Sequence, residues 1–539
     1  MLGNMMQRPL LISDLIEHAA RYYPNGAIVS RRCEGDIHRY NYRDAAQRTK
    51  QLANALTQYG IEPGDRIATL AWNGYRHYEV YFAVSGMGAV THTINPRLFP
   101  EQIIYIINHA QDRLVFVDLT FVPLLEKVKD QINCVEKIVI LADPDKMPDT
   151  SLDNAICYED FITDQSNEYT WPEFEENTAA ALCYTSGTTG NPKGVLYSHR
   201  STLIHAWAST MPDTLGISSS TNLLPVVPMF HVSAWGTPYA CTLTGANIIF
   251  PGPGLDGPSL TELIQKEQVD LLLGVPTVWL GLLSHLRETK QILNSVKQVV
   301  IGGSAAPLAM IKEFDEVHDA FVIHAWGMTE MSPIGTIGSM TRDMAAMDKE
   351  ERYRVQQKQG RACFGVQLKI VDDNGDELPQ DGTAFGRLLV RGPWIIERYY
   401  KAEETALENG WFDTGDVATI DAQGYMQIVD RNKDVIKSGG EWISSIELEN
   451  YAVGHPAVKE ACVIGIAHPK WDERPLLLVV PEDSITITHE EMTQFLEDKV
   501  AKWWLPNDTV VVKELPHTAT GKLLKVKLRE QFGNHYLQK

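Results

Sequence analysis

Eleven residues at 184–194, YTSGTTGNPKG, gather three glycines, four aliphatic hydroxyls and one lysine directly after the apolar run at 180–183. Glycines let backbone N–H groups close around phosphate oxygens, hydroxyls donate further hydrogen bonds, and Lys193 adds a movable positive charge. The spacing differs from G-x-x-x-x-G-K-[ST], so this is not a Walker-type loop. The segment predicts a phosphate-binding loop, and on composition alone a plain surface turn is the alternative.

A second group of small residues, at 302–307 in VVIGGSAAP, follows an apolar strand. A flat ring can lie against such a backbone, and Trp326 in HAWGMTE offers a face for stacking on the other side of that ring. The same segment ends in Thr329 and Glu330, a hydroxyl beside a carboxylate, which suit a phosphate oxygen and a Mg²⁺ ion. A tight turn and a solvent-exposed Thr-Glu pair are the alternatives for these residues taken singly.

Charged residues that suit a nucleotide follow later in the chain. Asp416 ends WFDTGD, where its carboxylate can accept from both hydroxyls of a ribose, although Thr-Gly-Asp is also a common turn. Two basic segments come next, DRNKDVIKSGGEWIS at 430–444 and PHTATGKLLK at 516–525. A mobile cation from such a segment would stabilise the charge that develops when one anion attacks another, and a solvated basic surface is the alternative.

These segments, in this order, resemble the signature motifs of the AMP-forming acyl-CoA synthetases, members of an adenylate-forming superfamily shared with luciferases and nonribosomal peptide adenylation domains. The resemblance covers nearly the whole chain. It implies ATP, Mg²⁺ and coenzyme A as cofactors and co-substrates, and a carboxylic acid as the substrate. The carboxylate would attack MgATP to give acyl-AMP and pyrophosphate, and coenzyme A would then displace AMP.

The resemblance also implies roles for individual residues. The catalytic residues would be Lys522, which is the adenylating lysine, together with Glu330, Thr329 and Lys193. Mg²⁺ would be held by Glu330 and Thr185. Lys433 would be a hinge about which a small C-terminal domain swivels between the two half-reactions. The implied nucleotide-binding residues are Thr185, Ser186, Gly187, Thr188, Thr189, Gly190, Gly303, Ser304, Ala305, Ala306, Pro307, His324, Ala325, Trp326, Gly327, Met328, Thr329, Asp416, Ile428 and Arg431.

Two further sites follow from the same resemblance. His231 in PMFHVSAWG matches an aromatic gate, and Trp235 and Trp326 would limit acyl length, with a core position as the alternative for Trp235. For Arg474 a surface salt bridge is the alternative to binding a phosphate of coenzyme A. The implied acyl pocket is His231, Val232, Trp235, Gly302, Trp326 and Pro333. The implied coenzyme A residues are Lys437, Ser438, Gly439, Gly440, Glu441, Trp442 and Arg474.

The segments HAWGMTEMSP and HPKWDERPLLLVV together are similar to the branch of the family that holds medium-chain fatty acyl-CoA ligases and 3-methylmercaptopropionyl-CoA ligase. This similarity implies a short or medium unbranched acid, with the thioether 3-methylmercaptopropionate as one candidate and a medium-chain fatty acid without thioether preference as another. Three other activities are alternatives: an adenylate-forming oxygenase, a peptide-synthetase-like adenylating enzyme, and a non-catalytic nucleotide-binding sensor.

The elements that must position these residues alternate along the chain. Helical periodicity, as in ISDLIEHAARYY and YRDAAQRTKQLANALTQYG, is interleaved with short apolar runs such as LVFVDL and KQVVIGG, which predicts an α/β fold of stacked subdomains with parallel sheets. From about Gly360 to Asp430, strands with turn residues predict a small, β-barrel-like antiparallel unit. Strands and helices after Asp430 predict a compact, mobile α+β domain. We therefore expect a large N-terminal domain at 1–431 and a small C-terminal domain at 432–539.

Composition narrows the remaining choices. The chain has 539 residues and a net charge of −21, which argues for more than one domain and against a nucleic-acid partner. Its seven cysteines are never spaced as C-x-x-C, which predicts free thiols in a reducing compartment, the cytoplasm. The lack of a long apolar run or a signal-peptide pattern predicts no membrane span and no leader. The assembly state is open, with a homodimer as one option.

Overall fold

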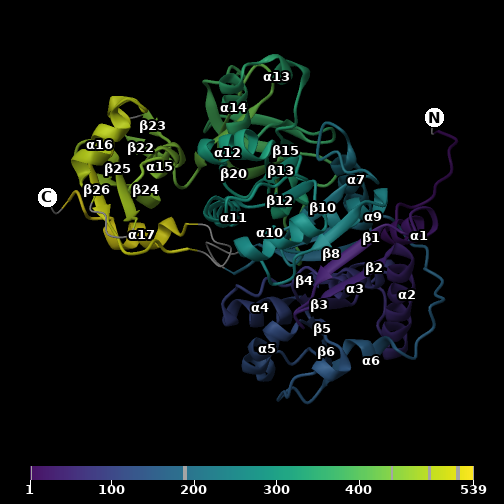
Figure 1. The fold of residues 1–539 in the computed structure, drawn as a ribbon. Helices are drawn as coiled ribbons and strands as arrows, with labels where there is room; N and C mark the ends of the chain where they lie inside the picture. Colours follow the sequence, from purple (N-terminus) through teal and green to yellow (C-terminus); the bar gives the residue numbers. More distant parts are fainter. Residues whose placement is uncertain (2, 186–190, 439–440, 483–486, 518–522, 538–539) are drawn as a thin grey trace.

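The computed structural model describes residues 1, 3–185, 191–438, 441–482, 487–517 and 523–537. Its larger, N-terminal part is built on two sheets (Figure 1). The first has seven strands and is parallel except where its last two strands pair antiparallel. In sheet order its strands are β7 (Ala155–Cys157), β6 (Lys137–Ile140), β5 (Asp112–Val117), β3 (Arg66–Leu70), β4 (Val90–Thr93), β8 (Ala179–Tyr184) and β9 (Gly194–Ser198).

The second sheet has nine strands, with a parallel centre and antiparallel edges. In sheet order its strands are β16 (Arg361–Ala362), β15 (Ile334–Ile337), β14 (Phe321–Gly327), β13 (Gln298–Ile301), β12 (Leu271–Gly274), β10 (Asn222–Pro225), β11 (Asn247–Phe250), β1 (Ala27–Arg31) and β2 (Ile37–Asn41). Because the carboxyl ends of parallel strands meet at one edge, the residues after β10, β13 and β14 gather there.

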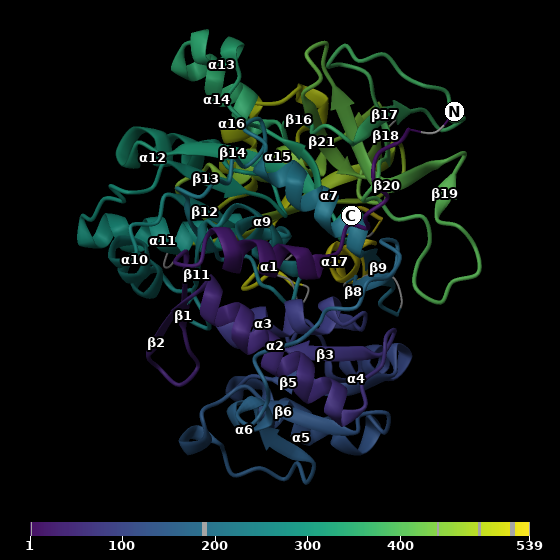
Figure 2. The same ribbon diagram turned by 90° about the vertical axis from the view of Figure 1, so that its right-hand side faces the viewer.

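Helix α3 (Tyr75–Gly86) is enclosed between the two sheets. All of its residues are buried, and it contacts β4 and β8 of one sheet and β1 of the other. Helices α1 (Ile12–Tyr22) and α2 (Tyr42–Tyr59) pack against α3 and extend this middle layer (Figure 2). The outer faces are covered by α4 (Pro100–Ala110) and α5 (Val122–Val128) on the seven-stranded sheet, and by α10 (Gly257–Lys266), α11 (Pro276–Thr289) and α12 (Leu308–His318) on the nine-stranded sheet. The other helices of this part are α6 (Tyr158–Ile162), α7 (His199–Thr210), α8 (Val232–Trp235), α9 (Thr237–Thr244), α13 (Arg342–Ala346) and α14 (Lys349–Gln357).

Helix α2 shows how local sequence sets the bounds of an element. The side chain of Asn41 accepts a hydrogen bond from the backbone N–H of Asp44 at the first turn, and Gly60 ends the helix with φ of 90°. An N-cap acceptor and a glycine in the left-handed region are the usual start and stop signals of a helix. The helix predicted from the periodicity of this segment is confirmed.

A third sheet of five antiparallel strands follows the two large ones. Its strands are β17 (Gln367–Val371), β18 (Phe385–Arg391), β20 (Trp411–Ile420) and β19 (Leu407–Glu408) in sheet order, with β21 (Met426–Arg431) paired to β20. This sheet is the small antiparallel unit that the turn-rich sequence between Gly360 and Asp430 predicts.

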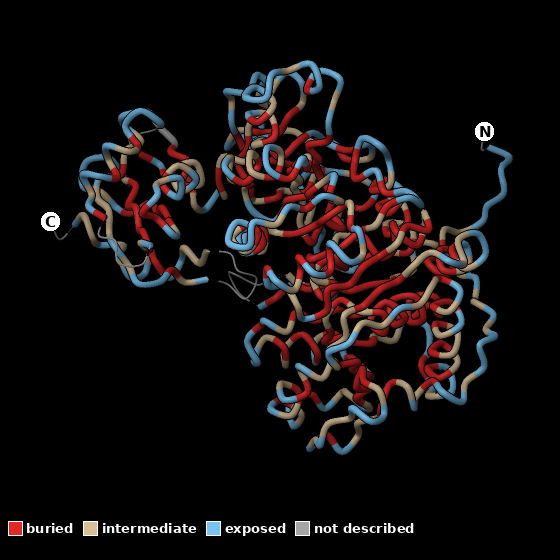
Figure 3. Tube along the Cα trace, in the orientation of Figure 1, coloured by how far each residue is buried: buried red, intermediate tan, exposed pale blue. Residues whose placement is uncertain are grey.

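The C-terminal part has its own sheet and its own core. Figure 3 shows buried residues running through both large sheets and, separately, through this smaller part. In sheet order its strands are β23 (Glu441–Ile443), β22 (Ile436–Ser438), β25 (Asp472–Pro481) and β24 (Val458–His468), with β26 (Asp508–Val511) parallel to β25. Its helices are α15 (Ser445–Val453), α16 (His489–Glu497) and α17 (Lys525–Phe532). The predicted α/β class, with a large and a small α+β part, is confirmed.

Asp430, near the end of β21, ties the two parts together. Its Oδ2 accepts the backbone N–H of Ser445 over 2.7 Å. Within the C-terminal part, the ammonium of Lys525 on α17 donates to Oε1 of Glu449 on α15 over 2.8 Å. Burial lowers the pKa of Lys525, but the carboxylates of Glu449 and Asp430 outweigh that effect and raise this pKa above its usual value. A buried lysine between two carboxylates therefore joins β21, α15 and α17.

Two further expectations concern the cysteines and the membrane-spanning segments. All seven cysteines lie within the described residues, and each is a free thiol. Among the helices that the structure describes, none is both long enough and apolar enough to cross a membrane.

Candidate active site

The glycine-rich segment begins at the end of β8 and returns at the start of β9, and its neck is closed by two hydrogen bonds. The backbone N–H of Thr185 donates to the carbonyl of Lys193 over 2.9 Å, and the N–H of Lys193 donates to Oγ1 of Thr185 over 3.2 Å. Ser186, Gly187, Thr188, Thr189 and Gly190 lie outside the described residues. The structure therefore brings the two ends of the predicted phosphate loop together.

Aromatic residues contact the residues that form this neck. The hydroxyl of Tyr184 lies 2.7 Å from Nδ1 of His109 on α4, and the N–H of Tyr400 donates to the carbonyl of Gly194 over 2.8 Å. A Cβ atom on Gly194 would lie 3.0 Å from Cβ of Tyr400 and 3.2 Å from the ring of Tyr184. A side chain at position 194 would therefore push against the residues that hold the loop.

The residues predicted to hold adenine and ribose meet at the carboxyl ends of β13 and β14. Gly303 and Ser304 are exposed there. The indole Nε1 of Trp326 donates to Oδ2 of Asp416 over 2.9 Å, and Nε of Arg431 lies 2.8 Å from Oδ1 of the same carboxylate. Strand pairing explains part of this geometry, because Asp416 on β20 and Arg431 on β21 are direct neighbours across the sheet.

Asp416 is well prepared to bind a polar ligand. It is only 3% exposed, and Arg431 keeps its charge compensated. A carboxylate oxygen has two lone-pair directions and can accept more than one hydrogen bond, which is what the two hydroxyls of a ribose require. Trp326 is itself fixed from one side, since a Cβ atom on Gly335 would lie 2.6 Å from its ring.

Thr329 and Glu330 lie in a single 3-10 turn, η4 (Thr329–Met331), which leads into a cis peptide bond before Pro333. The hydroxyl of Tyr197 donates to the carbonyl of Thr329 over 2.6 Å, and the hydroxyl of Tyr399 donates to Oε1 of Glu330 over 2.8 Å. Glu330 is 7% exposed and, within the described ranges, forms no ion pair. A buried carboxylate of this kind fits a Mg²⁺ ion, which takes few protein ligands and keeps waters and phosphates.

The acyl-pocket segment adopts an unusual backbone. Val232, Ser233, Ala234 and Trp235, which form α8, have φ values of 46°, 50°, 50° and 58°. The left-handed region costs a residue other than glycine about 1–2 kcal/mol, so the surroundings must impose this turn. It places the ring of Trp235 2.8 Å from the position of a Cβ atom on Gly302. The structure thus brings together Trp235 and Gly302, two of the predicted pocket residues.

Asn73, which follows β3 after Ala71 and Trp72, fixes the chain segment that leads into this turn. Its Nδ2 donates to the carbonyls of Pro225 and Val227 over 2.8 and 2.9 Å, and its Oδ1 accepts from the N–H of Met229 over 2.6 Å. The hydroxyl of Tyr81 on α3 donates to the carbonyl of Met229. Sequence reasoning missed Asn73 and Tyr81, and the only signal for Asn73 was a polar residue at the carboxyl end of a buried strand.

Some predicted nucleotide residues form the frame of the site. His324 is buried, which lowers its pKa to about 4, and its Nδ1 lies 3.0 Å from the carbonyl of Gln357. The N–H of Met328 donates to the carbonyl of Pro333 over 3.1 Å. The N–H of Ile428 donates to the side chain of Gln359 over 2.6 Å. The other predicted nucleotide residues nearby are Ala305, Ala306 and Pro307 before α12, and Ala325 and Gly327 on β14. Of the predicted acyl-pocket residues, His231 precedes α8 and Val232 begins it.

The predicted coenzyme A residues lie in the small C-terminal sheet. Nη1 of Arg474 donates to Oγ of Ser438 over 3.1 Å, and the same guanidinium donates to Asn507 and to two backbone carbonyls. No carboxylate of the described chain forms an ion pair with Arg474, so the alternative of a salt bridge is not found there. Lys437 lies on β22, and Glu441 and Trp442 lie on β23. Gly439, Gly440 and Lys522 lie outside the described residues.

Lys433, the predicted hinge, is exposed between β21 and β22. The two residues after it, Asp434 and Val435, both donate their backbone N–H groups to the carbonyl of Arg431, over 2.8 and 2.9 Å. The chain therefore makes a tight turn between the larger and the smaller part.

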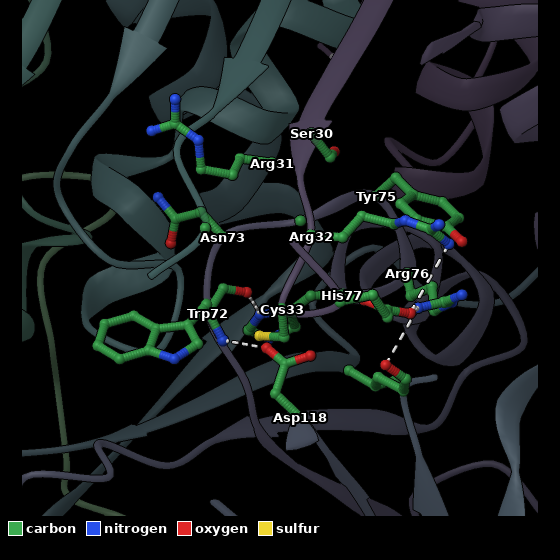
Figure 4. A pocket seen from close by; sticks show the side chains of 14 residues that line it. Ser30, Arg31, Arg32, Cys33, Trp72, Asn73, Tyr75, Arg76, His77 and Asp118 are labelled. Carbon is green, nitrogen blue, oxygen red and sulfur yellow. Dashed lines mark hydrogen bonds and ion pairs between the residues drawn. The ribbon is translucent and has the colours of Figure 1, made fainter. Parts of the chain in front are cut away.

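A polar cavity of about 30 Å³ lies apart from these residues, at the carboxyl ends of β1, β3 and β5 (Figure 4). The guanidinium of Arg76 in its wall forms three ion pairs. Its Nη1 lies 2.7 Å from Oε1 of Glu34, its Nη2 lies 2.5 Å from Oδ1 of Asp143, and its Nε lies 2.8 Å from Oε1 of Glu159. Figure 4 also shows Asp118 accepting from the backbone N–H of Trp72. The volume holds about one or two water molecules. The cavity is therefore a small space lined by ion pairs between the two large sheets.

Comparison with known proteins adds independent findings. A family model described as an AMP-binding enzyme matches residues 16–400, and one described as the AMP-binding enzyme C-terminal domain matches residues 447–522. A 3-methylmercaptopropionyl-CoA ligase of Ruegeria lacuscaerulensis is 50% identical over 99% of this chain and 99% of its own. A medium-chain-fatty-acid–CoA ligase of Ectopseudomonas oleovorans is 49% identical over 100% of this chain and 99% of its own.

Among solved structures, the anthranilate CoA ligase AuaEII in complex with anthranoyl-AMP is similar, with a TM-score of 0.85 and 25% identity over 97% of this chain and 98% of that one. The larger family model alone covers well over half of the chain, and the full-length relatives extend the likeness to both of its parts. These findings establish that the chain belongs to the family of AMP-binding enzymes.

Proposed function

We propose that this protein activates a short- to medium-chain carboxylic acid as an acyl-adenylate and transfers the acyl group to coenzyme A. It is an acyl-CoA ligase that uses ATP, since it belongs to the AMP-binding enzymes and its full-length relatives are named as CoA ligases. The observation that carries the proposal is the hydrogen-bonded group of Trp326, Asp416 and Arg431. Such a group offers a ring face and a compensated carboxylate to the nucleoside half of ATP.

In the first half-reaction, a carboxylate oxygen attacks the α-phosphorus of ATP, and the bond to pyrophosphate breaks. Thr185 and Lys193, whose backbones close the neck of the loop, would hold the departing pyrophosphate. Glu330 and Thr185 would ligate Mg²⁺, which when bound neutralises phosphate charge. Lys522 would stabilise the charge shared by the attacking and attacked groups.

In the second half-reaction, the thiol of coenzyme A attacks the acyl carbon, and AMP leaves. We assign the domains as 1–431 and 432–539, with Lys433 as the hinge between them. The separate sheet and core of the C-terminal part support this division, and the hydrogen bond from Ser445 to Asp430, which crosses the proposed boundary, must break if the small domain swivels. Lys437, Ser438 and Arg474 in the small domain would then face coenzyme A.

The acid is proposed to be unbranched and short or medium in length, with 3-methylmercaptopropionate tested first. The contact between Trp235 and Gly302 supports a pocket of limited depth. The named relatives act on 3-methylmercaptopropionate and on medium-chain fatty acids. A medium-chain fatty acid without thioether preference is the second candidate. We infer a reducing, cytoplasmic location from the seven free thiols, and a homodimer is the first assembly to test.

A screen of pyrophosphate release tests this function. Linear acids from C2 to C12, aromatic acids and thioether acids are supplied with MgATP, with and without coenzyme A, and the products are identified by mass spectrometry. We expect acid-dependent pyrophosphate and, with coenzyme A, equal amounts of AMP and thioester. Pyrophosphate without thioester, together with O₂ uptake, would indicate an oxygenase instead. Nucleotide binding without any pyrophosphate would indicate a sensor.

A further inference from the structure

Tyr399 lies between two charged residues that the proposed reaction assigns to the triphosphate and its metal. Its hydroxyl donates to Oε1 of Glu330 over 2.8 Å, and the ammonium of Lys193 lies 4.9 Å from the centre of its ring. We propose that Tyr399 is a positioning residue that orients the Glu330 carboxylate toward Mg²⁺ and holds Lys193 toward the pyrophosphate end of ATP. This inference rests on the proposed function and deepens it.

The backbone on both sides of Tyr399 is fixed to the two walls of the site. We refer to residues 394–400, between β18 and β19, as the strap. The N–H of Ile396 in the strap donates to the carbonyl of Glu330 over 2.8 Å, and the N–H of Tyr400 donates to the carbonyl of Gly194 over 2.8 Å. Tyr399 sits between these two anchors. Its side chain is therefore placed relative to η4 and to the phosphate loop at once.

The hydroxyl of Tyr399 acts on a carboxylate that suits a metal. Glu330 is 7% exposed and, across the described ranges, has no cationic partner. A donor on Oε1 fixes the rotation of the carboxylate and leaves Oε2 and the second lone pair of Oε1 for other partners. Hydrogen bonds of this kind orient metal-ligating groups, and their loss typically lowers metal affinity 10–100-fold.

The ring of Tyr399 acts on Lys193 in a different way. Lys193 is exposed, and among the described carboxylates none forms an ion pair with it. An aromatic face attracts an ammonium without cancelling its charge, whereas a carboxylate in the same place would neutralise it. The ring therefore restrains Lys193 while leaving its full positive charge for a phosphate oxygen.

A purely structural role is the competing explanation, because Tyr399 is half-buried and packs against the main core. The two accounts differ in what the hydroxyl does. If Tyr399 only fills space, Tyr399→Phe keeps its function, since the ring is retained. If it positions Glu330, the same variant weakens metal binding and leaves other properties in place.

The test is direct metal binding to the full-length protein. Mn²⁺ replaces Mg²⁺ and is titrated by electron paramagnetic resonance in the presence of α,β-methylene-ATP, which cannot form the adenylate. For Tyr399→Phe we expect the Mn²⁺ dissociation constant to rise at least tenfold. Affinity for the analogue in EDTA should be unchanged, because the ring still faces Lys193. Tyr399→Leu should lower that metal-free affinity about two- to fivefold as well.

Tyr353→Phe is the matched control. The hydroxyl of Tyr353 on α14 donates to a carboxylate oxygen of Asp315 over 2.6 Å, so the variant deletes the same kind of bond away from the site. We expect wild-type Mn²⁺ affinity in this variant. An unchanged Mn²⁺ dissociation constant in Tyr399→Phe would overturn the orienting role, and equal metal-free affinities of Tyr399→Phe and Tyr399→Leu would overturn the role toward Lys193.

A double-mutant cycle distinguishes the loss of this hydrogen bond from misfolding of the variant. In a Glu330→Gln background, Tyr399→Phe should produce no further loss of Mn²⁺ affinity, because its target is already gone. Additive losses would contradict the proposal. Failure of the proposed function has a separate signature: the wild-type protein would then form no acid-dependent thioester, whereas failure of this inference leaves the wild type fully active.

Discussion

The indole N–H of Trp326 points at the carboxylate of Asp416 across 2.9 Å, and the guanidinium of Arg431 holds the other oxygen of that carboxylate. The three side chains come from β14, β20 and β21, which belong to two different sheets. A buried and compensated carboxylate thus lies beside the indole, and the two together suit the ribose and the ring of a nucleotide.

Asp416→Asn should raise the KM for ATP at least tenfold, because the amide loses both the charge and half of the acceptor capacity offered to ribose. The matched control is Asp413→Asn on the same strand, where Asp413 is paired with Arg387 over 2.8 Å. We expect the control to stay within about twofold of the wild type. Steady-state kinetics with ATP varied measures both, and equal effects of the two variants would contradict the assignment of the ribose site.

Gly302→Ala should shift the acid preference toward shorter chains. A Cβ atom at this position meets the ring of Trp235 at 2.8 Å, so the indole must move, and the neighbouring carbonyl of Ala325 at 3.2 Å closes the other side. Trp235→Ala should act in the opposite direction and admit longer acids. The measurement is kcat/KM across the C2 to C12 series, and identical chain-length profiles in both variants would show that this contact does not line the acyl pocket.

Lys433→Pro should separate the two half-reactions. A proline fixes φ near −65° and restricts the preceding residue, so it resists a swivel at this turn. We expect adenylation to stay within about twofold of wild type and thioester formation from supplied acyl-AMP to fall more than tenfold. Lys433→Ala, which deletes the side chain but leaves φ free, serves as the control. If both variants convert acyl-AMP at the same rate, position 433 is not the hinge.

Asp118 should make the stability of the protein depend on pH near neutrality. Burial raises the pKa of this carboxyl to about 7, against the N–H of Trp72, which lowers it. The folded protein therefore holds a proton that the unfolded chain has already lost, and the free energy of unfolding falls as the pH rises toward and through 7. Each pH unit across this window corresponds to about 1.4 kcal/mol at most.

In Asp118→Asn this fall should be reduced, because the amide does not ionise and its oxygen can still accept from Trp72. Urea unfolding at pH 5, 6, 7 and 8 measures the difference between the variant and the wild type. The same loss of stability with rising pH in both proteins would show that Asp118 is already ionised in the folded state at pH 5.

Short segments of the sequence predicted the family and the reaction because together they carry the resemblance to it. The glycines and hydroxyls beside Lys193 suggested phosphate binding by themselves, whereas the roles of Glu330 and Asp416 came only from the resemblance. All three roles stay predictions. The parallel sheets followed from the alternation of apolar runs with amphipathic helices, as for α2 and β13.

The contacts that align these segments could not be predicted, because they join positions far apart in the chain. Tyr399 is 69 residues from Glu330, and Asn73 is 156 residues from Met229. The left-handed turn at 232–235 was also invisible, since none of its residues is a glycine or an asparagine. Its conformation is imposed by the surrounding structure and not by local preference.

The central claim, an acyl-adenylate formed from ATP, is tested most directly with a carboxylic acid labelled with ¹⁸O in both carboxylate oxygens. After one turnover with ATP and coenzyme A, mass spectrometry follows the label. Attack on the α-phosphorus leaves one acid oxygen bridging to phosphorus, so the account predicts AMP with one ¹⁸O atom and unlabelled pyrophosphate. Unlabelled AMP, or ¹⁸O in inorganic phosphate released alongside ADP, would contradict it.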